Sequence, residues 1–152
     1  MERRVTIAII GAVILFLGTA SCDKTKRKTK KFIKEGHWVM DSLMAGNNEI
    51  DDLPTWYISP CENHADYCLG TWNHKNGSHT NFYWKFSNMG GNFEFISDSL
   101  EIYTTTMAYA QCLNFSGEYK VKKSKNKIVH LESTATDGYP GTLVTIMLSV
   151  QE

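Results

Sequence analysis

The sequence predicts an all-β fold, a small antiparallel up-and-down barrel of about eight strands. Apolar and polar residues alternate along several short segments, which is the period of a strand with one buried face. Turn residues separate these segments, and none of them has the pattern of a convincing amphipathic helix. An open sheet of this size would leave exposed edges, so we expect a closed barrel, with a β-sandwich as the alternative.

The segment 67–96 is expected to form three consecutive strands with one aromatic face. Phe82, Trp84 and Phe86 alternate with polar or amphipathic residues, so their rings share one side of a strand. An Asn-Gly pair precedes this strand and suits a type I′ turn, because both residues tolerate positive φ. Phe93 and Phe95 continue the same face on the next strand.

Trp84 lies in the middle of this segment, so we expect it to be a buried packing residue. Truncating such a Trp to Ala typically costs about 3 to 5 kcal/mol of folding free energy. Trp56 lies in a short segment bounded by Pro54 and Pro60, on an extended piece leading into the three strands. We therefore expect Trp56→Ala to be tolerated better than Trp84→Ala.

The residues before this segment are expected to open the fold. A strand over 35–44 would place Trp38, Met40 and Met44 on one face. The acidic, turn-rich stretch 47–54 is expected to form a loop.

The residues after the segment are expected to complete the sheet. The assignment over 100–112 is open, because 107–111 is equally able to form a helical turn. A hairpin is expected over 117–131, and the last strand over 143–150.

The N-terminus has the composition of an export signal. Arg3 and Arg4 precede an uncharged apolar run over 5–17, followed by small residues and Cys22. The run is shorter than the about 20 residues that span a bilayer, so a permanent transmembrane helix is the weaker interpretation. The sequence therefore predicts a signal peptide over 1–21.

The end of this segment, Leu17-Gly18-Thr19-Ala20-Ser21-Cys22, resembles a bacterial lipoprotein signal. The resemblance implies that Cys22 becomes the mature N-terminus and carries acyl chains such as palmitate, as the lipid anchor. Thr19 replaces the usual aliphatic residue, a looseness that resembles lipoproteins of Bacteroidetes-type bacteria. The alternative is an ordinary cleaved signal that leaves Cys22 free.

Charge divides the rest of the chain into a basic tether over 22–34 and an acidic body over 35–152. Residues 23–34 hold seven Lys or Arg and one acid, whereas 35–152 hold seven Lys and 14 acids. We expect the tether to be solvated and extended, and attracted to anionic headgroups when it lies close to them. An exported chain rarely meets nucleic acid, so we expect no nucleic-acid partner.

Two short motifs resemble the lipocalin-like domains of bacterial lipoproteins. Gly36-x-Trp38 is similar to the start of such domains, where the Trp plugs the closed end of the barrel, and Gly117-x-Tyr119 resembles a strand of their second half. The resemblance covers residues 36–150 and implies one lipocalin-like β-barrel domain. The long aromatic segment and the cysteines are not general features of that family.

Three cysteines remain in the body, and an exported protein meets an oxidising compartment. We expect one disulfide, with Cys61 and Cys68 as the favoured pair and Cys68 with Cys112 as the alternative.

Motifs for metal binding or catalysis are weak. His74 and His79 could converge across a hairpin, but no Cys-x-x-Cys or His-x-x-x-His spacing is present. No Gly-x-Ser-x-Gly sequence occurs either. We expect no metal, no cofactor and no enzymatic activity.

The aromatic face has two interpretations, a filled core or a cavity for a small hydrophobic ligand. In the second, the residues proposed to line the cavity are Trp72, Trp84, Phe86 and Phe95. The expected function is a membrane-anchored binding module of the cell envelope for such a ligand, and the alternative is an accessory subunit that docks on a larger envelope complex.

Basic residues follow Asp23 where surface-exposed lipoproteins tend to carry acids, so we expect the body to face the periplasm.

Overall fold

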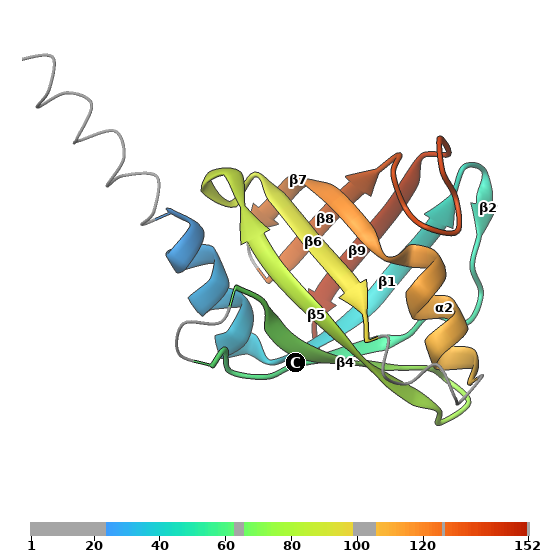
Figure 1. Ribbon diagram of the computed structural model, residues 1–152, viewed down its shortest axis with the longest axis horizontal. Coiled ribbons are helices and arrows are strands. Elements are labelled where there is room, and N and C mark those ends of the chain that lie inside the picture. The colour runs from blue at the N-terminus through green and yellow to red at the C-terminus, as the bar shows by residue number, and fades with distance from the viewer. Residues whose placement is uncertain (1–23, 63–65, 99–105, 126, 152) are drawn as a thin grey trace, which may run out of the picture.

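Nine antiparallel strands form one sheet that closes on itself into a barrel (Figure 1). The computed structural model describes residues 24–62, 66–98, 106–125 and 127–151. The strands are β1 (His37–Ala45), β2 (Asn48–Glu49), β3 (Thr55–Ile58), β4 (Cys68–Asn73), β5 (His79–Ser87), β6 (Asn92–Ser97), β7 (Gly117–Lys125), β8 (Ile128–Ser133) and β9 (Val144–Val150).

Each strand of the barrel pairs with the next one along the chain. β2 pairs only with β1, and the other eight strands run in sequence order until β9 returns to pair with β1. The predicted Asn-Gly turn joins β4 to β5, and Asn73 lies opposite His79. The closed antiparallel barrel confirms the predicted fold class, with α2 (Met107–Phe115) inserted between β6 and β7.

The inward face of β1 differs from the prediction in its second half. Trp38 and Met40 are buried as expected, but a β-bulge interrupts the pairing with β9 between Met40 and Ser42. A bulge adds one residue to one strand and so reverses the alternation beyond it. Leu43 is consequently the next fully buried residue, and Met44 lies on a less buried position of the strand.

The basic segment expected to be extended is helical over 24–35. Its Phe32 is 2% exposed and belongs to the barrel core, so the core begins before residue 35. Lys and Arg are good helix formers, and burial of one aromatic ring adds the tertiary contact that a short helix needs. The expected extended tether is wrong for these residues.

The open assignment over 100–112 resolves in part to the helical alternative. Met107–Phe115 forms α2, whose N-cap Thr106 accepts a hydrogen bond from the backbone N–H of Tyr109 at 3.2 Å. Residues 99–105 lie outside the described residues.

No helix in the described part of the chain is long and apolar enough to cross a membrane.

Candidate functional site

The four residues proposed to line a cavity lie in the centre of the barrel, on β4, β5 and β6. Trp72, Trp84 and Phe95 are fully buried, and Phe86 is 6% exposed. Their rings contact one another and neighbouring rings: Trp72 lies 5.8 Å from Phe95 between centroids, and Trp84 lies 6.0 Å from Phe86. These distances are those of packed aromatic pairs.

Trp56 is a central member of this cluster that the sequence interpretation placed at the margin. It lies on β3, is fully buried, and packs against Trp72, Phe82 and Phe95 at centroid distances of 5.5, 5.1 and 5.3 Å. Its Nε1–H has no hydrogen-bond partner within the described residues. The signal in the sequence is the run of β-branched and aromatic residues Thr55 to Ile58, which is typical of a strand, and the structure buries Trp56 and Ile58 and exposes Tyr57.

The helical segment 24–35 closes one end of the barrel. The Phe32 ring stacks on Trp38 and meets Trp84, Phe86 and Phe93 edge-on at centroid distances between 5.1 and 5.6 Å. The opening bordered by Phe32, Trp38 and Phe86 has a volume of about 10 Å³, close to the space of a single water.

Helix α2 packs against the sheet near the other end. Ala108, Cys112 and Phe115 are buried, and the Trp72 Nε1–H donates to Gln111 Oε1 at 3.0 Å. The Tyr119 hydroxyl on β7 donates to the carbonyl oxygen of Phe115 at 2.5 Å. Burial raises the pKa of Tyr119 well above its ordinary value, so this phenol stays a hydrogen-bond donor in the core.

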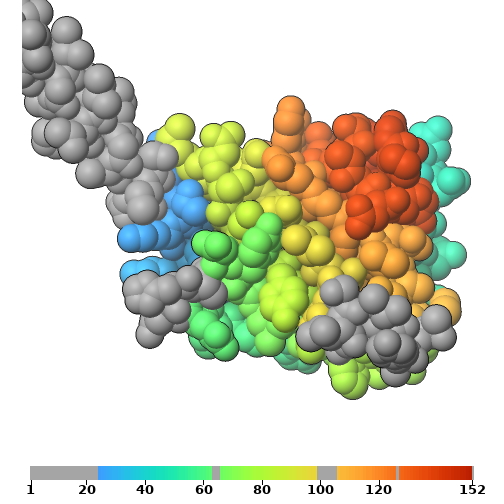
Figure 2. Space-filling view, viewed as in Figure 1, coloured from blue at the N-terminus to red at the C-terminus, as the bar shows by residue number. Residues whose placement is uncertain are grey.

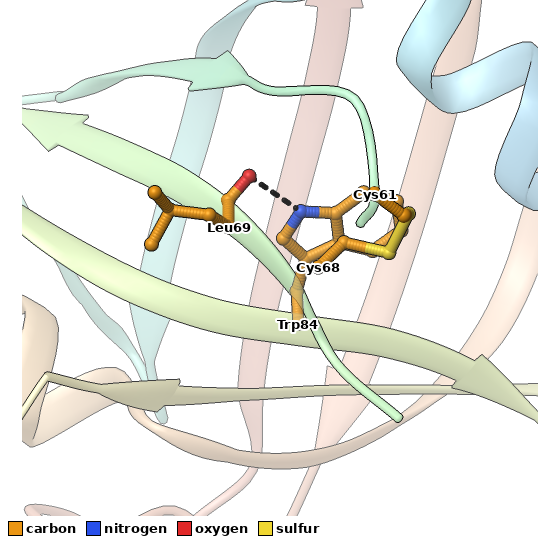
Figure 3. Close-up of a disulfide and its surroundings, with 4 residues drawn as sticks. All are labelled: Cys61, Cys68, Leu69 and Trp84. Atoms are coloured by element: carbon orange, nitrogen blue, oxygen red, sulfur yellow. Dashed lines mark hydrogen bonds between the residues drawn. A yellow bond between two sulfur atoms is a disulfide. The ribbon is translucent and has the colours of Figure 1, made fainter. Parts of the chain in front are cut away.

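The predicted disulfide joins Cys61 to Cys68, and the buried Cys112 takes no part in a disulfide within the described residues. Cys68 is the cross-strand neighbour of Trp84, whose Nε1–H donates to the carbonyl oxygen of Leu69 at 3.2 Å (Figure 3). The disulfide therefore ties the segment before β4 to Cys68, the position of β4 that lies directly opposite Trp84. The disulfide prediction is confirmed, and the Cys68–Cys112 alternative is wrong.

The other predicted site residues carry no assembled chemistry. His74 is buried and its Nδ1 accepts from the Asn76 backbone N–H at 3.2 Å, while His79 is exposed. No group of three or more His, Cys, Asp or Glu that could hold a metal occurs among the described residues. Cys22, the predicted lipid anchor, lies outside the described residues, and its acylation stays a prediction.

An apolar row on the outer wall of the barrel was not predicted. Leu69, Tyr83 and Ile96 lie directly opposite one another on β4, β5 and β6 and are 38%, 38% and 41% exposed. All three side chains are outward because they alternate with core residues along their strands. Figure 2 shows the face of the molecule on which β4, β5 and β6 reach the surface.

A polar cluster adjoins this row on the same strands. Lys85 Nζ lies 3.1 Å from Glu94 Oε2 and donates to the Tyr67 hydroxyl at 2.7 Å, while that hydroxyl donates to Glu94 Oε2 at 2.9 Å. The hydrogen bond with Tyr67 raises the pKa of Lys85, with a further contribution from Glu94 and an opposing one from burial. The cluster is partly exposed to solvent, with Lys85 and Glu94 side chains 33% and 27% exposed, so water screens the ion pair.

Comparison with protein families, with curated proteins and with solved structures gives no match to this chain.

Proposed function

We propose that the protein is a lipid-anchored binding module of the bacterial cell envelope that docks on a protein partner through the outer wall of its barrel. Capture of a small hydrophobic ligand would require an internal cavity, whereas docking through the outer wall would not. The observation that carries the proposal is the filled lumen, where Trp56, Trp72 and Phe95 are fully buried against one another and Trp84 is fully buried against Phe93. A ligand at these residues would have to displace packed rings, which is costly in a close-packed interior.

The outer wall offers the chemistry that protein interfaces use. Tyr83 stands at the centre of the apolar row, flanked by Leu69 and Ile96 on the neighbouring strands. Aromatic and apolar residues are enriched at the centre of interfaces, and polar residues form the rim. The Lys85–Glu94 ion pair lies on the same two strands as Tyr83 and Ile96 and would serve as such a rim.

Partner binding is tested by native mass spectrometry of the protein extracted from membranes in mild detergent. We expect the wild type to carry a protein partner, and Tyr83→Ser with Ile96→Ser to lose most of it. Leu113→Ser, on α2 and equally exposed, is the matched control and should keep the partner. A wild-type protein that carries a small molecule in place of a protein would favour the ligand-binding function.

The membrane anchor rests on the sequence around Cys22. Cys22→Ser should release the protein from membranes after export or leave the uncleaved precursor, whereas Ser21→Ala should remain anchored. The measurements are membrane fractionation and gel mobility. A Cys22→Ser protein that fractionates and migrates like the wild type would contradict the anchor.

The direction in which the body faces follows from the basic residues after Asp23. We propose a periplasm-facing body. Protease added to intact cells should leave the protein undigested, and protease added after the outer membrane is opened should reach it. Digestion in intact cells would place the body on the cell surface.

A further inference from the structure

Three segments far apart in the sequence form a basic surface at one end of the barrel. The helical segment 24–35 lies beside the β5–β6 turn and the β7–β8 hairpin (Figure 1). Together they border an open groove of about 370 Å³. Its lining residues are Lys24, Arg27, Lys28, Lys31, Met89 and Ser124. Lys127 of the hairpin borders the smaller opening beside it, which shares Lys28 and Lys31 with the groove. We call this surface, defined by Lys24, Arg27, Lys28, Lys31, Met89 and Lys127, the basic end.

The charges of the basic end share one sign. Lys24, Arg27, Lys28 and Lys31 follow the helical spacing of three and four residues, so their side chains project from the same face of the helix. No acidic side chain of the described residues lines either opening. The body as a whole is acidic, with 14 acids against seven Lys from residue 35 onward, so the basic end is a local concentration of positive charge.

The basic end is held in a fixed orientation relative to the barrel. Phe32 is inserted into the core from the same helix, and Lys28 Nζ donates to the carbonyl oxygen of Gly90 at 2.7 Å. Gly90 has φ +74°, and a Cβ at this position would lie 2.5 Å from Lys28 Cδ, so the turn approaches the helix as closely as glycine allows. The helix is therefore a fixed part of the barrel surface.

An exposed apolar side chain lies among these charges. Met89, at the β5–β6 turn, is 50% exposed and borders the groove together with Arg27 and Lys31. An apolar residue surrounded by lysines and arginine matches the boundary between phospholipid headgroups and acyl chains. This combination distinguishes the surface from a merely solvated charge run.

We propose that the basic end docks the barrel end-on against anionic phospholipid headgroups, with Met89 at the membrane interface. This inference rests on the anchor in the proposed function, because the predicted acylation site, Cys22, precedes Lys24 by two residues. The anchor would bring the basic end within the about 10 Å over which charges act at moderate ionic strength. Charge complementarity then selects anionic headgroups, and docking leaves the wall bearing Tyr83 facing sideways for a protein partner.

The test uses the full mature protein, purified with its anchor and reconstituted into phosphatidylcholine vesicles with and without phosphatidylglycerol. Met89→Cys carries an environment-sensitive fluorophore, and Met107→Cys on α2 carries the same label as the control. Both positions are exposed, at 50% and 59%, and α2 lies far from the basic end (Figure 1). Cys61 and Cys68 are bonded and Cys112 is buried, so the introduced thiol is the reactive one among the described residues.

We expect a quencher placed in the bilayer to reduce emission from position 89 several-fold more in anionic than in neutral vesicles, and to leave position 107 unchanged. Salt of about 1 M, which shortens the Debye length to about 3 Å, should abolish the difference. Lys31→Glu or Lys127→Glu should also abolish it. Lys75→Glu, which changes the net charge equally at an exposed turn elsewhere, should not.

Equal quenching of position 89 in neutral and anionic vesicles would overturn the inference, as would an equal loss in Lys75→Glu. Added DNA that is retained through Lys127 while position 89 stays unquenched would also overturn it, in favour of a nucleic-acid surface. Failure of the anchor is a separate result. In that case the protein leaves neutral vesicles altogether, whereas a charge-dependent approach of position 89 to anionic vesicles would still support docking.

Discussion

The Trp38 indole Nε1–H donates to the backbone carbonyl oxygen of Phe32 at 3.1 Å, while the two rings stack with their centroids 4.6 Å apart. One residue pair thus joins the last turn of the N-terminal helix to the first strand through both a polar and an apolar contact. The same carbonyl also accepts from the backbone N–H of Gly36 at 3.3 Å, so the indole is a second donor to the C-terminal end of the helix. The helix is therefore a structural part of the barrel.

Phe32→Ala should destabilise the barrel by about 3 to 5 kcal/mol, because it removes a ring buried against four others. Urea denaturation of a chain that begins at Lys24 measures the effect. Lys30→Ala, on the exposed side of the same helix, is the control and should change the midpoint little. If both variants unfold at the same urea concentration as the wild type, the helix does not contribute to the core.

Trp56→Ala and Trp84→Ala should both destabilise the protein strongly, by about 3 to 5 kcal/mol each. This differs from the expectation drawn from sequence, which ranked Trp56 as the more tolerant position, because both indoles are fully buried. The same denaturation experiment measures both changes. Met107→Ala, at an exposed position, is the control. If Trp56→Ala unfolds at the same urea concentration as the wild type, Trp56 is not a central packing residue of the core.

Substitution by Phe separates the two tryptophans by their hydrogen bonds. Trp84→Phe loses the bond to the Leu69 carbonyl, whereas the Nε1–H of Trp56 has no partner to lose among the residues that the structure describes. A net hydrogen bond contributes about 1 kcal/mol, and removing an unpaired buried donor relieves a cost. Trp84→Phe should therefore be the more destabilising change by about 1 kcal/mol or more. Equal free energies of unfolding for the two variants would contradict this assignment.

Peptide mapping without reductant should find Cys61 linked to Cys68, and Cys112 alkylated only after unfolding. Replacing both linked residues by Ser should lower stability by about 2 to 3 kcal/mol, the chain-entropy value for a loop of this size. Cys112→Ala is the matched thiol control, and the change in stability that it causes should be the same with and without reductant. A protein with three alkylated body cysteines would contradict the disulfide.

Alkaline pH should weaken the fold through Tyr119. Its pKa is raised by burial in the folded state, and the unfolded phenol ionises near pH 10. Above about pH 10 the unfolded chain loses a proton that the folded chain keeps, so the free energy of unfolding falls as pH rises. In Tyr119→Phe this decline should be smaller, although the lost hydrogen bond lowers stability at neutral pH. Parallel declines in wild type and variant would exclude Tyr119 as their source.

The central strands could be predicted from sequence because their signals are local. Phe82, Trp84 and Phe86 alternate strictly, and the Asn-Gly pair fixes the turn before them, so neither depends on distant contacts. The sequence favours the Cys61–Cys68 disulfide because these two cysteines enclose a short loop. Cys68 then lies opposite Trp84, a relationship that depends on strand register.

The sequence-based expectations for the segment 24–35, for the second half of β1 and for Trp56 were wrong for different physical reasons. The helix over 24–35 depends on one ring, Phe32, inside a run dominated by charge, so composition favoured an extended tether. The bulge after Met40 depends on the pairing of β1 with β9, which no local pattern reveals. The prolines that flank Trp56 indicate a marginal segment, but Pro54 is itself buried and the strand begins directly after it.

The outer row was missed for a related reason. Leu69, Tyr83 and Ile96 are separated in sequence and become neighbours only through the pairing of three strands. The basic end depends likewise on contacts between the helix, Met89 and Lys127. Both surfaces are products of tertiary structure.

The pairing of β1 with β9 also determines when the barrel can form during synthesis. A chain that emerges from its N-terminus first presents His37–Ala45 long before Val144–Val150, so the first strand must wait for the last. Until then β1 and β8 are open edges able to pair with other chains. Loss of the last strand, even by a short C-terminal truncation, would therefore leave an aggregation-prone sheet in place of a slightly smaller barrel.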